Sequence, residues 1–197
     1  MSKEPPFLTS RGVAVYKALL WRRRIHCKDN EFFRAIDYWD RWYGSDRIRT
    51  YRSTDEEIGR PGVVAFAGNV CLTADERRID LARKGCAFSN TLIGHEVNHI
   101  ALNHHKFTTQ VANFDLGKGT YGYAIIPKNQ KEKEADFGAT VLLCGVALAD
   151  KRLSALDLAR RACVDVGLVA KAQRFVQLDV FQRELWRPNP DLDLRVL

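Results

Sequence analysis

Apolar residues recur at helical spacing over most of the chain, and they alternate with polar residues only in one short region. The helical period predicts helices over 11–25, 30–43, 89–105, 130–149, 154–167 and 168–185. Alternation over 47–53 and two short apolar runs within 62–75, which meet at Gly68-Asn69, predict about three short strands. Short sequential strands with tight turns are typical of a small antiparallel sheet. The pattern therefore favours an α+β fold that is mainly helical, with further helices at the C-terminal end.

Helix boundaries follow from capping residues. Asn30, Ser89 or Asn90, and Ser154 stand where N-caps are expected, and Gly167 is expected to stop the helix that begins at 154. A chain of 197 residues is long enough for one core. We therefore expect a single domain over 1–197, with 151–183 as a C-terminal helical part and candidate subdomain.

Composition narrows the class of protein. Hydrophobic residues make up 46% and charged residues 28% of the chain, as in an ordinary globular protein. The formal net charge of +7 makes nucleic acid a compatible partner, although a solvated basic surface explains it as well. The five cysteines are widely spaced, which excludes a disulfide framework and favours a reducing compartment. No secretory signal is evident, and the longest apolar run, 141–149, is too short to span a bilayer, so we expect a cytoplasmic protein with no membrane partner.

Four of the five histidines lie in the stretch "GHEVNHIALNHH", residues 94–105. His95, Glu96 and His99 form an HExxH motif, and residues four apart lie on one face of a helix, so both imidazoles can reach one metal ion. Neutral imidazoles suit Zn²⁺, and Glu96 can act as general base on water at the site. The competing interpretation is an amphipathic helix that carries histidines at its solvent-exposed end.

A catalytic zinc site needs a third protein ligand, and two candidates exist. His105 stands where a metzincin places its last histidine, but Leu102 replaces the glycine that turns the chain back. Glu132, in the helix-forming stretch "EKEAD", is the candidate we favour. Asp136, one turn further on, is expected to support the site by accepting a hydrogen bond from a ligand imidazole. We expect His104 and His105 to form the exposed end of the helix.

Together the stretches "IGHEVNHIALNHH" and "EKEADFGATVLL" resemble the ImmA/IrrE family of metallo-endopeptidases, over roughly residues 32–177. The resemblance implies a zincin-like domain with a single Zn²⁺ held by His95, His99 and Glu132, and with Glu96 as general base. It further implies a protein substrate, a helix-turn-helix transcriptional repressor whose cleavage derepresses stress or mobile-element genes. Two departures stand out. Asn98 replaces a small residue of the family, which changes the fit of the HExxH helix against the neighbouring helix. "LLCG" replaces "LLMP", so the proline that would stop the helix beginning at 130 is absent and that helix is expected to run longer.

Residues 107–129 contain "GTYGY" and are expected to form a long loop over the site, from which Tyr121 or Tyr123 could donate to an oxyanion. Two other functions remain open: a basic zinc protease that acts on DNA-bound proteins, and a non-catalytic DNA- or protein-binding regulator with a structural metal site. A structural site needs a fourth protein ligand, for which no Cys or His stands at convincing spacing. The zinc-dependent endopeptidase is therefore the favoured function, and nucleic acid is not a required partner.

Overall fold

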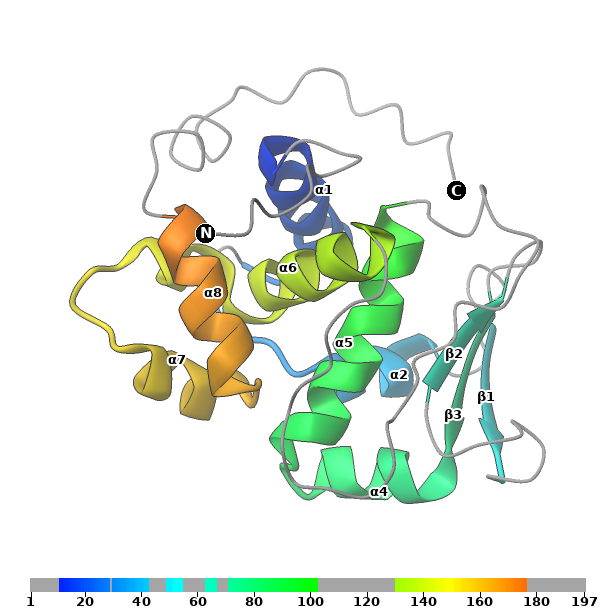
Figure 1. Ribbon diagram of the computed structural model, residues 1–197. Coiled ribbons are helices and arrows are strands. Elements are labelled where there is room, and N and C mark those ends of the chain that lie inside the picture. Colours follow the sequence, from blue (N-terminus) through cyan, green and yellow to red (C-terminus); the bar gives the residue numbers. More distant parts are fainter. Residues whose placement is uncertain are drawn as a thin grey trace.

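The computed structural model describes residues 11–28, 30–42, 49–54, 63–66, 71–102 and 130–176, and most of them are helical (Figure 1). The helices are α1 (Arg11–Arg24), α2 (Ala35–Trp42), α4 (Glu76–Arg83), α5 (Ala87–Ala101), α6 (Gln130–Cys144), α7 (Ala155–Ala162) and α8 (Val166–Val176). A 3₁₀ helix, η2 (Gly145–Ala149), follows α6. The prediction of a mainly helical chain is confirmed.

Helix α5 lies at the centre of the molecule. It packs against α6, which crosses it, and against α2 and α4 (Figure 1). On its other side α6 packs against α1, and α8 packs against both α6 and η2. Every residue of α5 from 89 to 100 is buried, and α7 and α8 contribute side chains to the same hydrophobic cluster. The HExxH motif therefore sits on the most enclosed helix of the described chain.

Three short strands lie beside α4 and α5 (Figure 1). They are β1 (Arg49–Ser53), β2 (Val63–Phe66) and β3 (Cys71–Asp75), with β3 in the middle. Strand β2 pairs antiparallel with β3, whereas β1 pairs parallel with it. The prediction of an antiparallel sheet is therefore wrong for β1. It assumed that consecutive strands become neighbours, but β3 inserts between β1 and β2. The expected turn at 68–69 lies outside the described residues.

Tertiary contacts move several predicted helix ends. Helix α2 begins at Ala35 instead of after Asn30, because the segment before it is not helical and the amide of Phe33 donates to the carbonyl of Leu143 at the end of α6. Helix α5 begins at Ala87, so neither Ser89 nor Asn90 is its cap. Helix α4 has no counterpart among the predicted residue ranges. It begins after Asp75, whose carboxylate accepts a hydrogen bond from the backbone amide of Arg78.

Beyond α6 the ends are set by local backbone conformation. The α-helix does not continue past Cys144, contrary to prediction; Gly145 adopts a positive φ of 60° and the chain continues as a 3₁₀ helix. Ser154 caps α7 as predicted, with its hydroxyl accepting from the amide of Asp157. Helix α7 ends at the left-handed Cys163, so the predicted stop at Gly167 is wrong. None of the helices in the described ranges is long and apolar enough to cross a membrane.

Candidate metal centre

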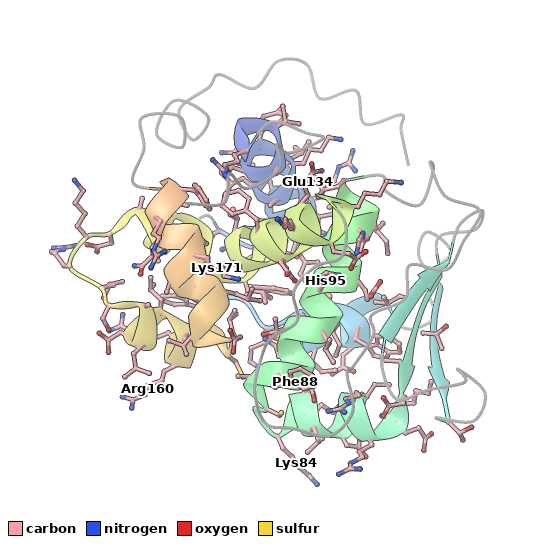
Figure 2. All side chains as sticks on the ribbon, viewed as in Figure 1. Lys84, Phe88, His95, Glu134, Arg160 and Lys171 are labelled. Carbon is pink, nitrogen blue, oxygen red and sulfur yellow. The ribbon has the colours of Figure 1, made fainter. Side chains whose placement is uncertain are left out.

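Helices α5 and α6 cross near His95 of the HExxH motif (Figure 2). Each of them contributes two polar residues one turn apart. His95 and His99 project from α5, and Glu132 and Asp136 project from the first half of α6. Both imidazoles are buried, with exposed fractions of 1% and 2%. The competing interpretation, histidines at the solvent-exposed end of an amphipathic helix, is therefore wrong for these two.

Three side chains bring nitrogen and oxygen atoms to one point. The Nε2 atoms of His95 and His99 are 2.9 Å apart. The carboxylate of Glu132 lies 3.1 Å from the first of these nitrogens and 3.5 Å from the second. These are the three residues that could hold a metal ion in the described part of the chain. The structure thus brings together the ligand set expected from the sequence.

The spacing of these atoms suits a small divalent cation. Ligand bonds of 2.0–2.2 Å in a tetrahedral zinc site place neighbouring donor atoms about 3.3 to 3.6 Å apart. The observed separations of 2.9, 3.1 and 3.5 Å lie within a few tenths of an ångström of that range. Two imidazoles and one carboxylate also form a donor set typical of catalytic zinc, in which a fourth position stays open. The residues present fit the metal that the resemblance implies.

Asp136 binds the imidazole of His95 at Nδ1, on the side of the ring opposite the Nε2 atom that faces Glu132. Its carboxylate lies 2.8 Å from Nδ1 of His95, and a carboxylate can only accept, so Nδ1–H donates. This hydrogen bond orients the ring and directs Nε2 toward Glu132 and His99. The supporting role that the sequence predicts for Asp136 has its expected geometry.

Electrostatics in the site favour positive charge. Burial lowers the pKa of His95, but its hydrogen bonds to Asp136 and Glu132 outweigh burial and raise the pKa far above the ordinary value. Burial raises the pKa of Glu132, yet the hydrogen bonds with both imidazoles hold it well below its usual range. Burial is the main cause that lowers the pKa of His99. The carboxylates of Glu132 and Asp136 thus favour a cation at this point, and the lowered pKa of His99 favours its neutral form, in which it can act as a ligand.

Glu96 lies inside the protein beside these residues. It follows His95 on α5, it is 1% exposed, and its charge acts on the His95 ring by raising that pKa. A carboxylate held in a buried setting next to a ligand can exchange a proton with water at the open side of the site. Its placement agrees with the role of general base.

Asn98 joins α5 to α6 next to the ligands. Its amide nitrogen donates to the carbonyls of Ala135 at 3.3 Å and Glu134 at 3.4 Å. A Cβ at Gly138 would meet the same nitrogen at 2.1 Å, so the absence of a side chain at 138 lets the helices approach. The carbonyls that Asn98 binds lie between Glu132 and Asp136 in sequence, so this contact sets how α6 presents both carboxylates to the imidazoles.

We expect Asn98→Ala to weaken zinc binding by about 10-fold, the lower end of the range for direct partners of metal ligands, because Asn98 acts on Glu132 through the α6 backbone and not through a bond to a ligand side chain. Without the amide, α6 loses its hydrogen-bonded position against α5, and the Glu132 carboxylate is held less closely. Competition against a zinc-binding dye measures the effect.

Asn90→Ala is the matched control for this change. Asn90 is also a buried asparagine of α5, two turns before Asn98, and it donates to the carbonyls of Ala162 and Cys163 at the end of α7. Its loss should lower the unfolding temperature but leave zinc affinity within about twofold of the wild type, because distant sites act independently. Equal losses of zinc affinity in the two variants would contradict a specific role of Asn98.

Four residues considered from the sequence fall outside the described residues: His104, His105, Tyr121 and Tyr123. The position of Glu132 beside both imidazoles supports it as the third ligand. His105 lies outside the described residues, so its candidacy is not tested. The contact of Asn98 with Gly138 was not foreseen. The one signal for it was that an amide stands at 98 where the resembling family has a small residue.

Comparisons with protein-family models, with curated proteins and with solved structures find no match for this chain. The case for a function therefore rests on the motifs and on the geometry of the site.

Proposed function

We propose that this chain is a zinc-dependent endopeptidase with a zincin-like HExxH helix. The observation that carries the proposal is the meeting of His95, His99 and Glu132 at one buried point between α5 and α6. Asp136 behind the first imidazole and the buried Glu96 beside it add the two carboxylates that a hydrolytic site needs.

The residues divide the chemistry among them. When bound, Zn²⁺ supplies Lewis acidity, which lowers the pKa of water and polarises the peptide carbonyl. His95, His99 and Glu132 would hold it, and Asp136 keeps the first imidazole in the orientation that exposes Nε2. Glu96 takes a proton from a water molecule while the oxygen of that water adds to the peptide carbonyl carbon. It returns that proton to the leaving amine as the C–N bond breaks.

The substrate in this proposal is a protein, and the resemblance points to a helix-turn-helix transcriptional repressor in the cytoplasm. The net charge of +7 is compatible with approach to a repressor bound on DNA. It does not require DNA contact, so nucleic acid stays an accessory partner in this proposal.

The metal itself is tested with the wild-type protein. Purified protein stripped by a chelator and then dialysed against excess zinc is expected to retain about one ion per chain, as a single mononuclear site would. Zinc binds the native state in preference to the unfolded one, so it should raise the unfolding temperature, and added chelator should reverse the shift. Retention of no zinc, with no shift in unfolding temperature, would contradict the proposal.

A further inference from the structure

The beginning of α5 and the end of α7 meet on the side of the molecule away from the metal centre. Cys163, which ends α7, lies with its Sγ 3.1 Å from the carbonyl oxygen of Gly85. The amide of Asn90 donates to the carbonyl of Cys163 at 2.8 Å. Cys86 immediately follows Gly85 as the extended N-cap of α5, its carbonyl accepts from the backbone amide of Asn90, and it lies close enough to Cys163 to act on that thiol electrostatically. Two cysteines far apart in sequence are therefore neighbours.

Both thiols are free and partly accessible to solvent, unlike those of Cys27 and Cys144, which are buried. A small oxidant can reach the Cys86–Cys163 pair without the core opening. A disulfide requires accessible thiols on residues whose Cα atoms lie within about 7 Å of each other. The partial exposure of both residues meets the first requirement, and the cross-linking experiment below tests the second.

The two thiols differ in acidity. Burial raises the pKa of Cys86, but the Ser89 and Phe88 groups at the start of α5 and the charge of Arg78 hold it below its ordinary value. Burial raises the pKa of Cys163; the charge of Arg34 lowers it by less, and the neighbouring Cys86 raises it. Of the two thiols, Cys86 is therefore the one with the larger thiolate fraction, and the thiolate is the form that attacks peroxide.

The backbone at Cys163 is also unusual. It adopts a left-handed conformation, with φ of 53° and ψ of 53°, at the C-cap of α7. Glycine is the ordinary residue at such a helix end, since a Cβ is strained there. A cysteine in place of glycine indicates that the side chain at 163 has a use.

We propose that Cys86 and Cys163 form a reversible disulfide in response to peroxide. The Cys86 thiolate attacks one oxygen of hydrogen peroxide, which breaks the O–O bond and yields a sulfenic acid and hydroxide. The Cys163 thiol then attacks the sulfenic sulfur; the S–S bond forms, and the sulfenic hydroxyl leaves with the thiol proton as water. Cytosolic disulfides are commonly transient and redox-sensing, so the pair is compatible with a reducing compartment.

This disulfide would join the first turn of α5 to the turn between α7 and α8. Helix α5 carries His95 and His99 further along, so the link restrains the end of the helix on which the metal centre is built. The proposal stands independently of the peptidase function, because it concerns thiols and not the metal.

The test uses the reduced full-length protein and a small excess of hydrogen peroxide. Free thiols are alkylated, and the protein is digested and mapped by mass spectrometry. We expect the wild type to lose two thiols and to yield a peptide pair cross-linked between Cys86 and Cys163, which dithiothreitol separates. In Cys163→Ser, the sulfenic acid on Cys86 should persist and react with dimedone. In Cys86→Ser, no such cross-link should form.

Cys144 provides the internal control, because burial raises the pKa of its thiol to about 12 and the side chain is fully enclosed. In every sample, the Cys144 thiol should react with the alkylating reagent only after the protein has been unfolded. Absence of the cross-link in oxidised wild type, or a cross-link from Cys86 to another cysteine, would overturn the proposal. So would Cys163→Ser protein that carries no dimedone adduct at Cys86.

Discussion

Glu132→Ala is expected to weaken zinc binding by more than about 100-fold, since the loss of a ligand should exceed the 10- to 100-fold cost of losing an outer partner. Among the described residues, Glu132 is the one candidate ligand from α6, and its carboxylate lies 3.1 Å and 3.5 Å from the two imidazoles. Without it, two neutral nitrogens from one helix remain, and the negative charge that favours a cation is reduced. Competition of purified variants against a zinc-binding dye measures the affinity directly.

The matched pair for this prediction is Glu132→Gln and Glu134→Gln. Each removes one carboxylate charge from α6 while keeping the size of the side chain. Residues two apart on a helix point in different directions, and in Figure 2 Glu134 is on the side of α6 toward α1, away from His95. Only Glu132→Gln should weaken zinc binding markedly. Unchanged affinity in Glu132→Ala would mean that another residue completes the site, with His105 the first to examine by the same substitution.

Most residues of the candidate metal centre could be predicted from their spacing in the sequence. An HExxH motif on a helix places its two imidazoles on one face, and the interval of four between Glu132 and Asp136 does the same for the carboxylates. Because both intervals are helical, one crossing of α5 and α6 is enough to bring all four together. The periodicity of apolar residues likewise predicted most helices, and it failed mainly at their ends.

Features that depend on contacts between residues far apart in the sequence could not be predicted from local spacing. The parallel pairing of β1 with β3 follows from which strand enters the sheet between the others, and period-two alternation does not encode that order. The non-helical segment before α2 is held by a hydrogen bond from Phe33 to Leu143, more than a hundred residues away. The fit of Asn98 over Gly138 needs two helices at a known distance. In each case, the deciding interaction is non-local.

The buried setting of α5 illustrates the same limit. Its sequence mixes polar and apolar residues on all faces, as "SNTLIGHEVNHI" shows, which is compatible with a surface helix. In the structure residues 89–100 are all buried, and several of the polar ones have partners on other helices: Asn90 binds the end of α7, Asn98 binds α6, and the histidines meet Glu132. Buried polar residues with partners on other helices are what distinguish a site-bearing helix from a solvated one.

Glu96→Gln is expected to lower peptidase activity by about 10²- to 10⁴-fold, the usual contribution of a general acid or base. Zinc content should stay at the wild-type level. The amide keeps the size of the buried side chain but cannot take a proton from water. Activity is measured on a library of proteome-derived peptides, in which new amino termini are counted by mass spectrometry for wild type and variant. The separation of metal content from activity distinguishes this substitution from Glu132→Ala, which should lose both.

The same variant should retain its substrate, because the ligands and the binding surface are unchanged while the proton transfer is blocked. Cross-linking of Glu96→Gln protein in cells and identification of the captured protein therefore tests the substrate class, with Glu96→Gln,Glu132→Ala as the control that lacks the metal. Capture of a helix-turn-helix repressor that wild type cleaves in vitro would support the full proposal. New amino termini produced equally by wild type and Glu96→Gln would show that Glu96 is not the general base. If the metal were bound but neither protein cut any peptide, the site would be a structural one, and the non-catalytic regulator would become the better description of this chain.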